Sequence, residues 1–234
     1  MAGYAEFPRS PFFIWDPRSD TTGSMNPTFN PACRRCPRLA EFLDSVRLVE
    51  PQYYCRPVPA FGDPQARIVI VGLAPGMHGA NRTGRPFTGD HAGILLYRTL
   101  YKFGLASGPI STAADDGLKL QDVRITNSVK CLPPANKPLP VEIKECNLYL
   151  REELRQSRSA RVILALGAIA HAAVLRAYDL PAGRFRFVHA AEHVLTQDKV
   201  LLDSYHCSRY NTQTRRLTTE MFESVIGRAR ALSQ

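Results

Sequence analysis

No segment of this sequence is apolar enough to cross a membrane, because nowhere do about 18 apolar residues follow one another. The first twenty residues contain no hydrophobic stretch of the kind that signal peptides carry. There is also no internal repeat and no low-complexity segment. These absences argue against membrane, secreted and repeat proteins, and we expect a cytoplasmic protein without a membrane partner.

Two nucleotide-binding motifs are missing as well. Neither G-x-G-x-x-G nor G-x-x-x-x-G-K-[ST] occurs anywhere in the sequence. This argues against a doubly wound enzyme that holds nucleotide phosphates on a glycine loop, which stays open only as an alternative.

The composition that is present predicts a globular, basic protein. The chain has 234 residues, of which 44% are hydrophobic, so one domain with a large core is expected. The formal net charge is +9. Such a balance favours a polyanionic partner such as nucleic acid, although an unrelated basic enzyme would share it.

Apolar periodicity predicts alternating strands and helices. Strands are expected at 67–71, 123–131, 160–167 and 199–206, and helices at 36–50, 91–106, 141–157, 168–180 and 214–233. This order predicts an α/β fold with three layers, in which helices cover both faces of a four-stranded parallel sheet. Residues 1–30 lack periodicity and are interpreted as an irregular arm, which leaves one domain at 31–234.

The segments that follow the predicted strands carry the most informative residues. They read GLAPGMHGANRTGRPFTGD from Gly72, TNSVKCLPPANK from Thr126, LGAIAH from Leu166 and HCSRYNTQTRRLT from His206. In parallel sheets, ligands bind outside the carboxyl ends of the strands. The first segment holds five glycines, which indicates a close approach of the backbone to a ligand.

Cysteines suggest a second site. Cys33 and Cys36 form a C-x2-C pair, and Cys131 and Cys146 complete a set of four, with two further cysteines left over. Thiols in a chain without a secretion signal are expected to stay reduced. Four thiolates suit either zinc or an iron–sulfur cluster, and their spacing does not decide between the two metals.

The three segments that begin at Gly72, Thr126 and His206 resemble the motifs of the uracil-DNA glycosylase superfamily, specifically its family 5, or type b. With the cysteines, the resemblance spans residues 33 to about 218. Two positions bear on it: Cys207 stands where proline is common, and Leu73 replaces a glutamate typical of family 4. The resemblance implies the four-stranded fold and a [4Fe–4S] cluster on Cys33, Cys36, Cys131 and Cys146.

The resemblance also implies how a base rotated out of DNA is held. Gly72, Ala74, Phe87 and Asn127 correspond to uracil-binding residues, with the Phe87 ring stacking on the base. An amide such as that of Asn127 offers both a donor and an acceptor, so it can distinguish uracil from cytosine.

Two residues are expected to carry the catalysis. His206 corresponds to a histidine that hydrogen-bonds uracil O2 as negative charge builds on the leaving base. Asn81 lies where some relatives have an acidic residue beside the attacking water. Asp90 is the alternative water-activating group, although its position predicts a helix N-cap.

Basic and hydroxyl side chains after His206 predict contacts with DNA. The residues expected to bind the DNA backbone are Arg209, Asn211, Thr212 and Arg215. Arg34, Arg35 and Arg38 surround the first cysteine pair and are expected to add a second phosphate-binding patch.

Together these features predict a monomeric, monofunctional DNA glycosylase of the nucleoid that excises uracil and leaves an abasic site. Lys130 is the only lysine within the three family motifs GLAPGMHGANRTGRPFTGD, ITNSVKCLPP and HCSRYNTQTRRLT, and nothing marks it as an amine nucleophile. Hypoxanthine and other deaminated bases are further candidate substrates. The alternative is a non-catalytic iron–sulfur module that binds DNA, which would not need Asn127 and His206.

Overall fold

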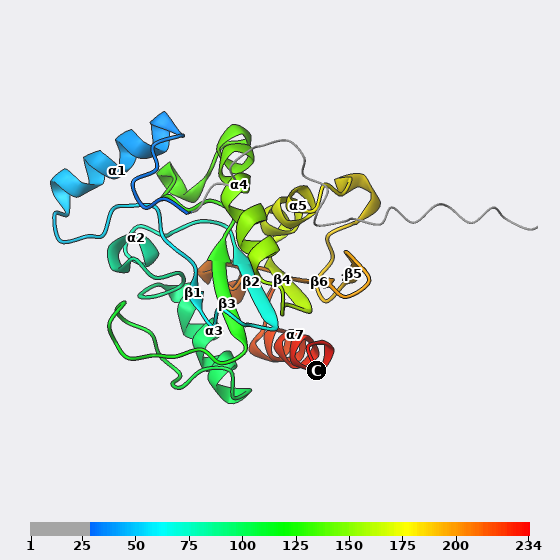
Figure 1. Ribbon diagram of the computed structural model, residues 1–234. Coiled ribbons are helices and arrows are strands. Elements are labelled where there is room, and N and C mark those ends of the chain that lie inside the picture. The colour runs from blue at the N-terminus through cyan, green and yellow to red at the C-terminus, as the bar shows by residue number, and fades with distance from the viewer. Residues whose placement is uncertain (1–28) are drawn as a thin grey trace, which may run out of the picture.

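A computed structural model describes residues 29–234, and its centre is a mostly parallel sheet between two layers of helices (Figure 1). Four parallel strands form the middle of the sheet in the order β3-β2-β4-β6. They are β2 (Ile68–Gly72), β3 (Val123–Asn127), β4 (Val162–Leu166) and β6 (Val200–Ser204). The predicted four-stranded parallel sheet is therefore confirmed. The expected N-terminal arm falls almost entirely on residues 1–28, which lie outside the described residues.

Two short antiparallel strands extend the sheet at its edges. They are β1 (Phe61–Gly62), which pairs with β3, and β5 (Glu192–Val194), which pairs with β6. Neither was predicted from the sequence. β1 has only two residues, and β5 is partly exposed without an apolar alternation, so neither carries the pattern that marks a buried strand.

Each face of the sheet is covered by a pair of helices (Figure 1). One pair is α3 (His91–Lys102) and α7 (Thr219–Leu232), and the other is α4 (Pro140–Gln156) and α5 (Ala168–Ala177). Alternate strand residues supply the two cores: Ile70 and Leu164 face the first pair, and Val71 and Ile163 face the second. Across residues 29–234, no helix has the length and apolar character needed to span a membrane.

The remaining helices are short or peripheral. α1 (Pro37–Val49) packs beside the cysteines, and α2 (Ala80–Thr83) lies inside the glycine-rich loop. α6 (Arg209–Gln213) follows β6, and two 3-10 turns cover Pro134–Asn136 and Ala182–Arg184.

Three predicted boundaries lie four or more residues from the observed ones, and the helix expected at 91–106 ends at Lys102. The strand expected at 123–131 ends at Asn127, because Ser128 and Val129 turn to donate their N–H groups to the carbonyls of Gly72 and Leu73. The helix expected at 214–233 begins only at Thr219. The backbone of Arg215 has φ of 55°, a left-handed conformation that a helix cannot include. α7 begins after it, with Thr218 as its N-cap residue.

Candidate active site

The ends of β2 and β3 bring two predicted residues together. Gly72 and Asn127 are direct partners in the parallel register. A Cβ atom at Gly72 would lie 2.4 Å from Asn127 Oδ1 and 2.6 Å from Phe87 Cζ. These distances are far shorter than van der Waals contact, so only glycine lets the Asn127 amide and the Phe87 ring close over the strand end.

Phe87 is held in place by its backbone. Its φ is 55°, a conformation that costs energy for a side chain of this size. Its carbonyl oxygen lies where a Cβ of Gly93 would be, at 1.8 Å, so α3 can pack here only with glycine at that position. The Tyr97 hydroxyl donates to the Pro86 carbonyl at 2.8 Å. The ring is thus presented by a fixed loop.

A buried arginine that sequence reasoning missed anchors the same loop. Arg85 is 5% exposed, pairs with Asp116 at 2.6 Å and lies over the Phe61 ring at 4.2 Å. Burial alone would raise the pKa of Asp116, but hydrogen bonds from Arg85 and from backbone N–H groups lower it. This ion pair fixes the loop to the segment after α3. The only indication of it in the sequence was that Arg85 lies two residues before Phe87.

His206 lies across the pocket from Phe87. The two rings are stacked with centroids 5.9 Å apart and an interplanar angle of 29°. Asn211 Nδ2 donates to the His206 carbonyl at 2.8 Å and fixes the backbone there. Burial lowers the pKa of His206 to about 4. The imidazole is therefore neutral at pH 7 and can offer one N–H to a ligand.

Two asparagines carry buried oxygens without partners. Among residues 29–234, only three buried side-chain polar atoms lack a hydrogen bond: Asn81 Oδ1, Asn127 Oδ1 and the Tyr178 hydroxyl. Leaving a buried acceptor unpaired costs roughly 1–3 kcal/mol, so such atoms are rare and often functional. Two of the three belong to residues predicted for the site.

The two candidates for positioning water differ in their surroundings. Asn81 is fully buried, and its Nδ2 contacts Cys55 Sγ at 3.5 Å. Asp90 caps α3, as expected, by accepting from the Gly93 N–H at 2.9 Å. Its other oxygen faces Gly79, where an added Cβ would lie 2.6 Å away. Burial raises the pKa of Asp90.

The four predicted cysteine ligands line one cavity between α1, α4 and the segment after β3. They are Cys33, Cys36, Cys131 and Cys146. The Lys130 N–H donates to Cys146 Sγ at 3.2 Å. Burial, with the neighbouring thiols, raises the pKa of Cys131 and raises that of Cys146 to about 11. Cys131 and Cys146 are therefore protonated at neutral pH unless a bound cation neutralises their thiolates.

Four cysteine side chains around one cavity can hold either a tetrahedral zinc ion or an iron–sulfur cluster, because both bind to four thiolates.

The remaining predicted residues are placed around this centre. Ala74 packs beside the cysteines, so only its backbone is available to a base. Arg209 and Arg215 are exposed. Thr212 Oγ1 is hydrogen-bonded to His91 Nε2 at 3.0 Å, which leaves it less free to reach DNA.

The arginines expected to bind phosphate near the cysteines form ion pairs in the structure. Arg34 pairs with Asp44, Arg35 with Glu145 and Arg38 with Glu142, at 2.7, 3.0 and 2.7 Å. The pairs of Arg35 and Arg38 link the segment around the first two cysteines to α4, and the expected phosphate-binding patch stays a prediction.

Two other sequence expectations are confirmed by burial. Cys207 is fully buried in the core, as expected for a packed residue. Lys130 is 1% exposed, and its Nζ lies 2.6 Å from a carboxylate oxygen of Glu153. A lysine held in this way is not available as a nucleophile.

Comparison with known proteins defines the class of this molecule. Residues 59–230 match the family described as the Uracil DNA glycosylase superfamily, so the chain belongs to that superfamily.

Similar proteins within the superfamily narrow the assignment. A type-5 uracil-DNA glycosylase of Thermus thermophilus is 48% identical over 207 residues, which cover 86% of this chain and 94% of that protein. The type-5 uracil-DNA glycosylase of Pyrobaculum aerophilum is 41% identical over 203 residues, or 85% and 88%. A type-4 uracil-DNA glycosylase of Archaeoglobus fulgidus matches only 53% of this chain, at 39% identity. The resemblance to family 5 is confirmed.

Proposed function

We propose that this chain hydrolyses the N-glycosidic bond of uracil in DNA and leaves an abasic site. The observation that carries the proposal is the unpaired, buried Oδ1 of Asn127 between Gly72 and the Phe87 ring. An acceptor in that position calls for a planar ligand with an N–H at its edge. The similar proteins from Thermus thermophilus and Pyrobaculum aerophilum are uracil-DNA glycosylases, which supports the same base and the same reaction.

Asn127 explains the choice of base. Uracil offers an N3–H to the amide oxygen and its O4 to the amide N–H, which satisfies both groups. Cytosine offers a lone pair at N3 and an amino group at position 4, so both amide groups would face like partners. Buried groups left unpaired in this way reject a wrong substrate strongly.

His206 stabilises the leaving base. Cleavage passes through an oxocarbenium-like state in which negative charge develops on the base. A neutral imidazole can donate its N–H to uracil O2 without giving up the proton, and burial keeps His206 neutral. Because Lys130 is paired with Glu153, this motif lysine is not free to form a Schiff base, and the enzyme is expected to leave the DNA strand intact.

Asn81 positions the attacking water in this proposal. Its unpaired Oδ1 needs a hydrogen-bond donor, and a water molecule meets that need. An amide holds a water without deprotonating it, which suffices when bond breaking runs ahead of attack.

The proposed cofactor is a [4Fe–4S] cluster on the four cysteines, supported by their placement around one cavity and by the resemblance to family 5. A bound cluster would supply structural stability at the junction of α1 and α4. We expect purified protein to be brown, with about four irons per chain. Replacing Cys131 by Ser should abolish the iron and lower the Tm, because cluster binding and folding are coupled. Replacing Cys55 by Ser, which changes a cysteine outside the set, should keep the iron.

DNA binding is assigned to the exposed surface after β6. Arg209 and Arg215 are exposed there, as is Arg216, while Asn211 and Thr212 support the backbone and α3. We propose that the protein works there as a monomer on nucleoid DNA.

An oligonucleotide with one uracil tests the function. After incubation, alkali should break the strand at the uracil, whereas omission of alkali should leave it whole. His206→Ala and Asn127→Ala should lose cleavage while keeping affinity for DNA. Binding without any base release by the iron-loaded parent would instead identify a non-catalytic module. A parallel substrate with hypoxanthine measures how far the substrate range extends.

A further inference from the structure

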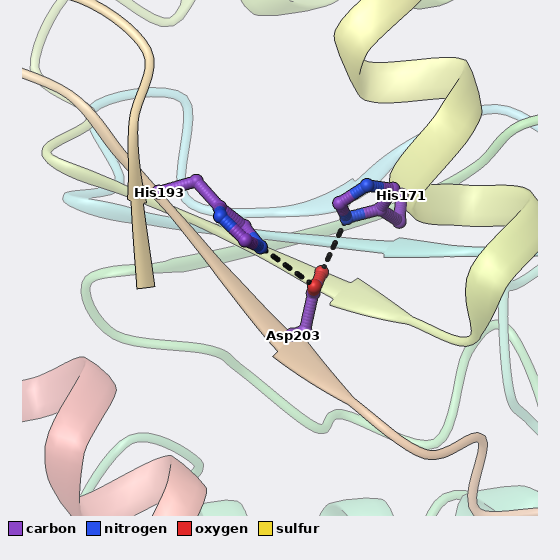
Figure 2. A group of neighbouring side chains, drawn as sticks. All are labelled: His171, His193 and Asp203. Carbon is purple, nitrogen blue, oxygen red and sulfur yellow. Dashed lines mark hydrogen bonds and ion pairs between the residues drawn. The ribbon is translucent and has the colours of Figure 1, made fainter. Parts of the chain in front are cut away.

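Two histidines and an aspartate point toward one another beside β6 (Figure 2). His171 comes from α5, His193 from β5 and Asp203 from β6. One Asp203 oxygen lies 2.8 Å from His171 Nδ1 and the other lies 3.1 Å from His193 Nε2. One ligand atom from each residue falls within 4.8 Å of the others.

The hydrogen bonds of His171 require a cation in this cluster. Its Nε2 lies 3.0 Å from the Phe185 carbonyl oxygen, an acceptor, so Nε2 carries a hydrogen. In a neutral ring, Nδ1 then has a lone pair, and that lone pair faces a carboxylate oxygen of Asp203. Two acceptors this close are stable only with a positive charge between them, either a proton on His171 or a metal ion.

We propose that His171, His193 and Asp203 bind one divalent transition-metal ion, with zinc as the fitting case. Two imidazoles and one carboxylate form a three-residue ligand set that proteins use for zinc, leaving a fourth position for water. Histidine ligands of metals usually donate their second N–H to a carbonyl, as His171 does to Phe185. Tetrahedral zinc needs these ligand atoms about 3.3 Å apart, so small side-chain shifts suffice.

Burial and access agree with this assignment. The Asp203 side chain is fully buried and that of His171 is 4% exposed, so the site is shielded from water. The His193 side chain is 13% exposed and lies on the edge strand, which provides a path for the ion. These ligands are hard nitrogen and oxygen donors, in contrast to the sulfur donors of the cysteine site.

A metal ion at this site would stabilise the part of the sheet from which His206 extends. It would join α5, β5 and β6 at one point. The connection between α5 and β5 also holds Tyr205, because His189 stacks on its ring at 5.0 Å and accepts from its N–H at 3.1 Å. Tyr205 directly precedes His206, so the ion would stabilise the backbone at the end of β6 that positions His206.

The test uses iron-loaded protein treated with a chelator and then given one equivalent of zinc sulfate. After gel filtration, the parent should retain one zinc per chain. Zinc K-edge absorption should show only nitrogen and oxygen neighbours at about 2.0–2.1 Å. At a hundredfold excess over the Kd, zinc should raise the Tm by about 5–10 °C.

Two histidine variants separate this site from others. His193→Ala should retain no zinc and show no zinc-dependent change in Tm, while its iron content stays at the parental value. His189→Ala changes a histidine of the same segment outside the ligand set, and it should bind zinc like the parent. Failure of the parent to retain zinc would overturn the proposal and leave a protonated His171 as the cation. A sulfur shell around zinc, or zinc retained by His193→Ala, would overturn it as well.

Discussion

Replacing Gly72 by Ala should inactivate the enzyme without unfolding it. The new methyl group would lie 2.4 Å from Asn127 Oδ1 and 2.6 Å from Phe87 Cζ, while ordinary contact begins at 3.4 Å. Both side chains must therefore retreat by about 1 Å, which is the scale of misplacement that costs about a hundredfold in rate. The clash falls on side-chain ends, so the backbone can keep its path and most of its stability.

Single-turnover excision from a uracil-containing oligonucleotide measures this effect directly. Gly72→Ala should cut about a hundredfold more slowly than the parent, with a cooperative thermal transition and an unchanged iron content. Gly183→Ala is the matched control, because a Cβ at Gly183 meets nothing within 4 Å, and it should cut at the parental rate. Full activity of Gly72→Ala would refute the idea that this close approach shapes the pocket.

Three further predictions address charge, DNA and water. Burial lowers the pKa of His206 to about 4. The excision rate should therefore stay constant down to about pH 5 and decline with a midpoint near pH 4. A decline of the rate centred near pH 6.5 would show that the imidazole is normally hydrated. Arg209→Ala should flatten the log–log dependence of DNA affinity on salt by about 0.9 without changing the base that is cut, as equilibrium titrations at several salt concentrations would show. Asn81→Ala should slow single-turnover excision with DNA affinity kept, whereas a parental rate for Asn81→Ala together with an inactive Asp90→Ala would transfer the water to Asp90.

The sequence predicted the fold best for strands that are buried on both faces of the sheet, because such strands are apolar at every position. The run from Ile68 to Val71 is fully buried, and its apolar residues alone mark it as a central strand. The exposed β5 obeys no such pattern, so only pairing with β6 reveals it. The late start of α7 depended on the left-handed backbone of Arg215, which a side-chain pattern does not encode.

The candidate site divides in the same way. Asn127 and His206 could be placed near each other because Asn127 ends β3 and His206 follows β6, and strand ends of a parallel sheet share an edge. Their roles came from the resemblance to family 5. The surroundings of Asn81 could not be predicted, because the Cys55 thiol reaches it from 26 residues away. Asp203 and its two histidines come from three elements without a common spacing. Such clusters arise only from tertiary packing.

The unpaired oxygen of Asn127 also bears on the fate of the product. It is already in place before any DNA binds, and the free base presents the same edge as the base in DNA. Part of the binding energy therefore does not depend on the sugar, so released uracil should compete with substrate. Turnover at high substrate concentration would then be governed by the departure of the base and the abasic strand, rather than by bond cleavage.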